Sequence, residues 1–271
     1  MKLLKLPPGT FALGPTKPSR RRFGVPPGGP FDAESFRVSR LLTTDQVETT
    51  FEVGYFGGEF QVEEPGMIIV SGASRPVRID DRVVAPNSVQ PVKAGTLTIG
   101  IAQTGVRSYV TFYPKAKYGP RTLEQPSSLA GTPLRVVVGP QGHEVDMAAF
   151  LRAHHASTTL LDRVGLRLKT TFQSGRIREY PSEPQCVGSI QLTPDGTPIV
   201  IGPDGPTLGG YPKIAIVISA DLDRLGQIAP AQSLEFELVT IDQARKLRED
   251  QIRSRERSLK QLAVLLREPA F

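Results

Sequence analysis

The stretch 182–213 contains the residues whose types and spacing could do chemistry. Lys213 is central to it, because this lysine stands where a Gly-Gly-Tyr-Pro loop at 209–212 becomes the most apolar strand of the chain, 214–218. Glycine permits close backbone approach and proline fixes φ, so the lysine would be held on rigid backbone. A cation held in this way can polarise a carbonyl group or stabilise a developing oxyanion. The local pattern by itself more often gives an edge lysine at a partly exposed strand start, with its ammonium in water.

The sequence gives little support for nucleotide binding, hydrolase or cysteine-nucleophile chemistry, a metal site or a covalently bound cofactor. The sequence contains no G-x-x-x-x-G-K-[ST], G-x-G-x-x-G or G-x-S-x-G motif. Cys186 has no base beside it in the sequence, so we expect a small core residue there. His154 and His155 are adjacent and would point to different faces, and His143 is the only other histidine, so no metal site is predicted. No Met-Lys-Met biotin-attachment sequence occurs, so no covalently bound cofactor is predicted either.

Composition predicts a globular chain with many turns. Among 271 residues, 26 are Gly and 25 are Pro, which favours short strands. The net charge of +6 permits contact with acidic partners but does not show it. Lys17, Arg20, Arg21 and Arg22 form a basic run without interleaved aromatic residues, so we expect a solvated loop and no nucleic-acid partner. No run of 18 apolar residues and no signal-peptide core is present, and one cysteine fits a reducing compartment, so a cytoplasmic protein without a membrane partner is expected.

The elements that must position Lys213 are mostly strands. Segments rich in β-formers recur at roughly ten-residue spacing with Gly and Pro between them, which favours barrels or sandwiches over βαβ units. The predicted strands are 67–70, 77–80, 96–101, 108–113, 134–138, 159–161, 199–201, 214–218 and 234–239. Helices are predicted only near 33–42, 146–154 and 242–268, and the proline-rich stretch 114–133 is the predicted linker. The last helix is strongly charged and is either a solvated tail or a partner-docking helix.

Several segments of the sequence resemble the signature motifs of one known family. The run 24–32 (GVPPGGPFD), followed by Ser35 and Arg37, resembles that family's GVPxSGAMDxxSxR signature. The run 162–168 (DRVGLRL) is similar to DRMGYRL, and 209–215 (GGYPKIA) is identical to the family pattern. The segments 182–183, 188–191 and 194–199 resemble SE…GAIQVPPDGxPI. Over about residues 24–240 the chain therefore resembles the biotin-dependent carboxyltransferase family. That family includes the C subunit of 5-oxoprolinase, the allophanate hydrolase 2 subunit and the carboxyltransferase part of urea amidolyase.

This resemblance implies a mainly β fold of two cyclophilin-like β-barrel domains with a C-terminal helix. The corresponding boundaries are 1–118 and 134–241 for the domains and 242–271 for the helix. The implied catalytic residues are Lys213, Asp162 and Arg163, with Lys213 polarising a ureido or amide carbonyl. The implied substrate-binding residues are Glu183, Gln191, Asp204, Thr207, Gly209, Gly210 and Tyr211. A neutral amide needs both donors and acceptors, and this set supplies both.

The chain also departs from the family pattern, which keeps three functions open. It lacks the Gln-Asp pair of VQDxGR before residue 24, and at 204–210 the family's DxQTTGG has lost a Gln and a Thr. The first interpretation is a C-type subunit of an ATP-dependent 5-oxoprolinase complex, with A-like and B-like partner proteins, a small cyclic amide as substrate and ATP used in the complex. The second is a carboxyltransferase for urea or a related amide, with biotin on a separate carrier. The third is a catalytically silent regulatory binding protein.

Overall fold

The computed structural model describes residues 2–5, 7–14, 18–42, 49–115, 119–123, 133–173, 175 and 177–267. Two compact units form. The first comprises Met1–Gly14, Asp32–Leu129 and Ile252–Phe271, and the second comprises Pro15–Phe31 and Ala130–Gln251. The sequence does not suggest that Pro15–Phe31 belongs with the second unit. In the predicted linker, 116–118 and 124–132 lie outside the described residues, and the sequence-derived domain boundaries stay a prediction.

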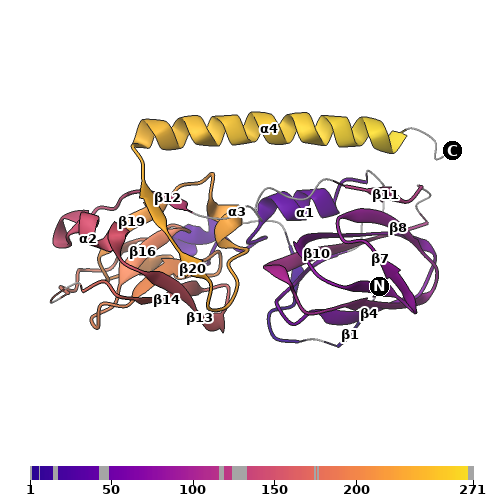
Figure 1. Ribbon diagram of the computed structural model, residues 1–271, viewed down its shortest axis with the longest axis horizontal. Coiled ribbons are helices and arrows are strands. Elements are labelled where there is room, and N and C mark those ends of the chain that lie inside the picture. The colour runs from indigo at the N-terminus through magenta and orange to yellow at the C-terminus, as the bar shows by residue number, and fades with distance from the viewer. Residues whose placement is uncertain are drawn as a thin grey trace. The chain divides into compact units, whose positions relative to one another are not determined.

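The first unit contains two antiparallel sheets (Figure 1). One has the order β1-β4-β9-β6-β7 and the other has the order β11-β8-β5-β10-β3-β2. Their bounds are β1 Lys2–Lys5, β2 Phe11–Leu13, β3 Thr50–Val53, β4 Gly58–Val62, β5 Gly66–Ser74, β6 Val77–Ile79, β7 Arg82–Val84, β8 Ser88–Val92, β9 Gly95–Ile99, β10 Thr104–Pro114 and β11 Arg121–Thr122. Alternation places residues such as Phe60 and Val62 in the core with Ile68, Val70 and Phe112.

Helix α1 (Ala33–Ser39) begins at the Asp32 that the resemblance singled out. The Asp32 carboxylate accepts hydrogen bonds from the Ser35 N–H at 2.9 Å and the Ser35 hydroxyl at 2.6 Å, so Asp32 caps the helix and Ser35 holds the capping carboxylate in place. The Asp32 N–H donates to the Tyr109 hydroxyl, which itself donates to Glu52 at 2.7 Å. Complete burial raises the pKa of Tyr109 well above its ordinary value. This part of the signature therefore has a structural role in the first unit.

The second unit is built on an eight-stranded sheet in the order β20-β13-β14-β17-β16-β19-β12-β21. Its bounds are β12 Leu134–Val138, β13 His155–Leu161, β14 Gly165–Thr170, β16 Ser189–Leu192, β17 Pro198–Ile201, β19 Lys213–Val217, β20 Ser233–Leu234 and β21 Phe236–Leu238. A separate small sheet pairs β15 (Glu183–Pro184) with β18 (Leu208–Gly209). The two edge strands β20 and β21 are separated by one residue of the chain, so the large sheet closes into a barrel. Its interior holds a core that includes Leu166, Ile190 and Ile214.

Helices are few and mostly short. Besides α1, the described residues form η1 (Pro18–Phe23), η3 (Gly142–Glu144), α2 (Met147–Arg152), α3 (Leu222–Leu225) and the long C-terminal α4 (Ile241–Arg267), which is the yellow helix of Figure 1. Mainly β structure with barrel-like sheets confirms the predicted fold class. No helix in the described part of the chain has the length and apolar character needed to cross a membrane.

Most predicted elements are present, and the differences have local causes. The predicted helix 33–42 ends at Ser39, because the Arg40 N–H already closes on the Arg37 and Val38 carbonyls. Helix α3 was not predicted, because it is a single turn of four residues. The predicted strand 234–239 is two short strands, since β20 pairs with β13 whereas β21 pairs with β12.

Candidate functional site

A row of four residues crosses the large sheet of the second unit. Lys213 on β19 pairs with Gln191 on β16, Gln191 pairs with Ile199 on β17, and Ile199 pairs with Arg167 on β14. Directly paired residues point to the same face of a sheet. Their strand neighbours Ile190, Val200, Leu166 and Leu168 lie in the core, so the row faces outward.

A β-bulge turns Lys213 away from the core. The register shifts between the pairs Ile190–Ala215 and Gln191–Lys213, which leaves Ile214 as an extra residue on β19. Regular alternation would put Lys213 on the same face as Ala215, whereas the extra residue reverses that orientation. Ile214 and Ala215 are both in the core, and Lys213 belongs to the outward row.

The Lys213 side chain is buried although it faces outward. The residue is 3% exposed, and its strand lies between β16 and β12, so the alternative of a solvated edge lysine is wrong. Its Nζ lies 3.2 Å from Oε2 of Glu183, which β15 supplies from the small sheet. Apart from this ion pair, Nζ has no hydrogen-bond partner among the described residues. A buried ammonium with unused donors can take a ligand acceptor.

Gln141 connects Lys213 to Glu183. Its Oε1 accepts a hydrogen bond from the Lys213 N–H, and its Nε2 donates to Glu183 Oε2, both at 3.0 Å. The Gln141 N–H donates to the Lys213 carbonyl at 3.1 Å, so the amide side chain is fixed from both ends. Lys213 and Gln141 both favour the carboxylate form of Glu183, which holds the pKa of Glu183 below its ordinary value.

The loop glycines are required because other groups approach them closely. A Cβ on Gly209 would lie 1.8 Å from Nε2 of Gln185 and 3.1 Å from Nε2 of Gln191, and one on Gly210 would lie 2.6 Å from the Tyr180 carbonyl oxygen. Gln191 Nε2 also donates to the Tyr211 carbonyl at 3.3 Å. Gln185 is buried, and its Oε1 lacks a partner among the described residues. An acceptor without a partner thus lies in the same cluster as the donors of Lys213.

Asp162, Arg163 and Asp204 form a separate group. Arg163 makes a bidentate ion pair with Asp204 at 2.7 and 3.0 Å and donates to the Gly29 carbonyl at 2.5 Å. Asp162 accepts from the N–H groups of Val164 and Gly165, both at 2.9 Å, and so shapes the turn before β14. Asp162 and Arg163 lie just before β14, whereas Lys213 begins β19. These two strands are three strand spacings of ~4.8 Å, or roughly 14 Å, apart in the sheet.

Among the residues predicted from the sequence, the structure brings one set together around Lys213. That set is Glu183, Gln191, Gly209, Gly210 and Tyr211, with Thr207 joined through its carbonyl, which accepts from the Gln185 N–H at 2.9 Å. Asp162, Arg163 and Asp204 are not in this cluster. Their hydrogen bonds instead hold a turn and the segment around Gly29, and a catalytic role for Asp162 and Arg163 stays a prediction.

Sequence reasoning missed Gln141, Gln185 and Arg21. The expectation of a core residue at Cys186 is also wrong, because Cys186 lies in the segment between β15 and β16 and is exposed. Gln141 follows the Gly-Pro that ends β12, and a polar residue directly after a buried strand is the signal that could have identified it. Arg21 donates through Nη2 to the Gln185 carbonyl, so the solvated loop expected for the basic run is wrong for this residue. Arg20, Arg21 and Arg22 are part of η1, in which Arg20 and Arg22 are exposed as expected, whereas Lys17 lies outside the described residues.

The sequence model of one protein family, the carboxyltransferase domain with subdomains A and B, matches residues 23–120 and 113–238 of this chain. The chain belongs to the carboxyltransferase-domain family. The two matched regions contain every site residue predicted above. Membership in the carboxyltransferase-domain family therefore confirms the resemblance that the motifs indicated.

Curated relatives in this family are of two kinds. The chain is 28% identical to the C subunit of 5-oxoprolinase from Escherichia coli, over 86% of this chain and 89% of the relative. It is 26% identical to urea amidolyase of Saccharomyces cerevisiae, over 85% of this chain but only 16% of that protein. The chain thus matches nearly the whole of one relative and a small part of the other.

Solved structures support the same fold. The chain superposes on the urea amidolyase of K. lactis with a TM-score of 0.79 and 23% identity, over 95% of this chain and 20% of that one. The urea carboxylase of Kluyveromyces lactis gives a TM-score of 0.77 at 23% identity, over 95% of this chain and 29% of that one. At this identity the likeness shows the fold alone.

Proposed function

We propose that this protein is the C-type subunit of an ATP-dependent 5-oxoprolinase complex and acts on a small cyclic amide together with partner proteins. The observation that carries the proposal is the buried Lys213 ammonium, which faces outward, contacts Glu183 and keeps unused donors. The match to nearly the full length of the 5-oxoprolinase C subunit, compared with a small part of urea amidolyase, supports this assignment.

The cluster provides the groups that opening an amide requires. Hydrogen bonds from Lys213 to the amide oxygen would draw electrons from the carbonyl carbon and stabilise the oxyanion formed on attack. Gln185 Oε1, which has no partner among the described residues, would accept the amide N–H. Gln141 holds the Lys213 backbone and Glu183 in place, so Lys213 needs little rearrangement before it binds.

The remaining machinery is assigned to partners. The sequence has no phosphate-cradle motif, so we assign ATP use to the A-like and B-like proteins of the complex. ATP would supply the driving force for ring opening, whereas this chain would bind and orient the amide. In this proposal the protein contains no covalently bound cofactor.

A carboxyltransferase acting on urea or a related amide is the second candidate, because the chain also matches part of urea amidolyase. Polarising a ureido carbonyl needs the same donors as polarising an amide. This function would use biotin on a separate carrier.

A catalytically silent regulatory binding protein is the third candidate. It is favoured by the Gln and the Thr of the family motif that are lost at 204–210.

Reconstitution distinguishes the three functions. The chain is combined with A-like and B-like 5-oxoprolinase proteins, and 5-oxoproline opening is measured with and without ATP. In parallel it is combined with a biotin carboxylase and a biotinylated carrier, and urea carboxylation is measured. We expect ATP-dependent ring opening in the first mixture only. Turnover only in the second mixture, or complex formation without turnover in either, would contradict the proposal.

A further inference from the structure

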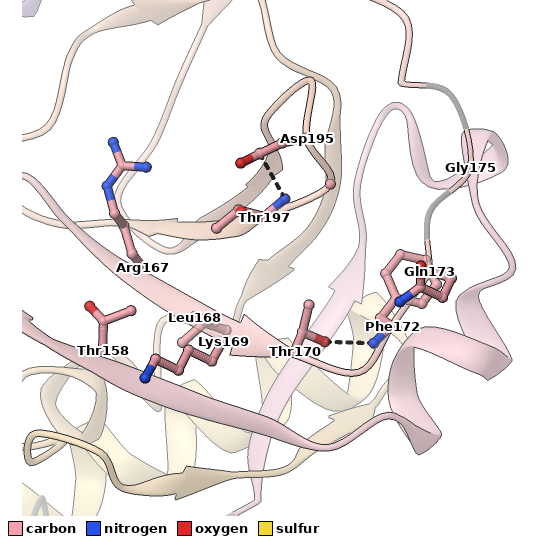
Figure 2. Close-up of a pocket in the computed structure, with 11 residues that line it drawn as sticks. Thr158, Arg167, Leu168, Lys169, Thr170, Phe172, Gln173, Gly175, Asp195 and Thr197 are labelled. Carbon is pink, nitrogen blue, oxygen red and sulfur yellow. Dashed lines mark hydrogen bonds between the residues drawn. The ribbon is translucent and has the colours of Figure 1, made fainter.

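A second feature of the outward face is a cavity of ≈ 670 Å³ in the second unit, shown in Figure 2. Its walls come from β13, β14, residues that follow β14 and the turn between β16 and β17. The polar lining residues are Thr158, Arg167, Lys169, Thr170, Gln173, Asp195 and Thr197. None of them belongs to the Lys213 cluster, so the proposed amide chemistry does not account for this cavity.

Two cations dominate the lining. Arg167 and Lys169 are two residues apart on β14, so their side chains leave the same face of the strand about 7 Å apart. Both are exposed, and neither forms an ion pair or hydrogen bond through its side chain with another described residue. Figure 2 shows both side chains on the side away from Gly175, with the Arg167 guanidinium directed upward and the Lys169 ammonium directed to the left. Their charge is therefore available to a ligand.

The one acidic lining residue is held by its own turn. Asp195 Oδ1 accepts hydrogen bonds from the Thr193 hydroxyl and from the Thr197 N–H, the latter at 3.2 Å. These bonds lower the pKa of Asp195, so the carboxylate is ionised at neutral pH. It forms no ion pair with Arg167 or Lys169, and the cavity keeps an excess of one positive charge.

We propose that this cavity binds the oxyanion group, a carboxylate or a phosphate, of a small ligand through Arg167 and Lys169. A guanidinium group forms paired hydrogen bonds with such oxygens, an ammonium adds a point charge, and threonine hydroxyls supply further donors. Arg167 is in the same row as Lys213 but roughly 14 Å away across the strands. A small lactam cannot span that distance, so the ligand is a second molecule or the far end of an extended one.

Binding to the full chain tests this without any activity measurement. Inorganic phosphate and sodium acetate are titrated separately at constant ionic strength, and the backbone amide shifts of Lys169 and Thr197 are followed by NMR. We expect saturable shifts with at least one of the two anions, and the stronger one identifies the oxyanion class. No saturable shift with either anion at tens of millimolar would overturn the proposal.

Matched variants make the test specific. Arg167→Gln and Lys169→Gln should each weaken binding by about fivefold, the effect of losing one charge at contact distance near water. Asp195→Asn should tighten binding, because it removes a repulsive charge, and unfolding cannot cause a change in this direction. Lys93→Gln, an exposed lysine of the first unit, should change nothing. Equal affinity in all four variants would contradict the proposed site.

Discussion

At the scale of single residues, the burial of Lys213 is the observation that needs an explanation. Removing an ammonium from water is costly unless its charge is balanced. Glu183 balances it only in part, because the Glu183 side chain is 40% exposed and Nζ keeps unused donors. A buried ion pair is also weak evidence for stability. A ligand-binding role accounts for the arrangement better than stabilisation does.

The pKa of Glu183 reports on this ion pair. In the folded protein it lies below its ordinary value because of Lys213 first and Gln141 second. The pair therefore stabilises the fold above the unfolded pKa of Glu183, and this contribution is lost as the pH falls through the folded pKa. We predict that Lys213→Met raises the pKa of Glu183, measured by carboxyl ¹³C NMR titration. An unchanged pKa would show that the two groups do not interact.

Gln141 is predicted to be a positioning residue. Gln141→Leu leaves the buried Lys213 N–H without its acceptor, which typically costs about 1–3 kcal/mol of the free energy of unfolding. The same change removes a donor to Glu183, so the pKa of Glu183 should also rise. Urea denaturation and the NMR titration measure the two effects. Gln103→Leu, at an exposed position, is the control for both, and equal behaviour of the two variants would be evidence against the role.

At the scale of elements, the turn after β12 must approach β19 closely. A Cβ on Gly139 would lie 2.2 Å from the Lys213 carbonyl oxygen, so backbone has to move. We predict that Gly139→Ala lowers the free energy of unfolding by about 1–3 kcal/mol, as overpacking does. Gly14→Ala, where a Cβ meets nothing within 4 Å, is the matched control in urea denaturation. Equal stability of the two variants would show that the turn adjusts freely.

The strands could be predicted from the sequence more readily than the orientation of Lys213. Runs such as 134–138 are continuously β-forming, and the structure has β12 at those residues. The bulge at Ile214 has no local signal, because Ile214 only begins the unbroken apolar run 214–218 and nothing in that run marks an extra residue. Without it, alternation assigns Lys213 to the wrong face. The cluster itself was only partly predictable, since Gln141 and Gln185 reach it through pairings between segments distant in sequence.

At the scale of the whole molecule, motif resemblance predicted the family, whereas the motifs did not distinguish structural from functional residues. Asp32 caps a helix with Ser35 as its hydrogen-bond donor, and Arg163 anchors Gly29. Lys213 and Glu183, from equally recognisable motifs, meet at the candidate site. Which motif residues meet depends on strand order, and no single motif contains that information.

The account also predicts the behaviour of the chain alone. Because ATP use is assigned to partners, the purified protein should neither open 5-oxoproline with ATP nor carboxylate urea. Both reactions are measured over hours at micromolar protein, with the reconstituted complex as the positive control. Robust turnover by the isolated chain would refute the dependence on partners.

The most direct test of the central claim is Lys213→Met in the reconstituted complex. The change keeps similar bulk and removes the charge, and losing one preorganised donor typically reduces the rate by about 10²–10³-fold. The matched control is Lys246→Met, an exposed lysine on α4, which should retain normal turnover. Melting curves and complex formation should match wild type in both variants. If Lys213→Met kept near-wild-type turnover, or lost activity only by unfolding, the proposed role of Lys213 would be wrong.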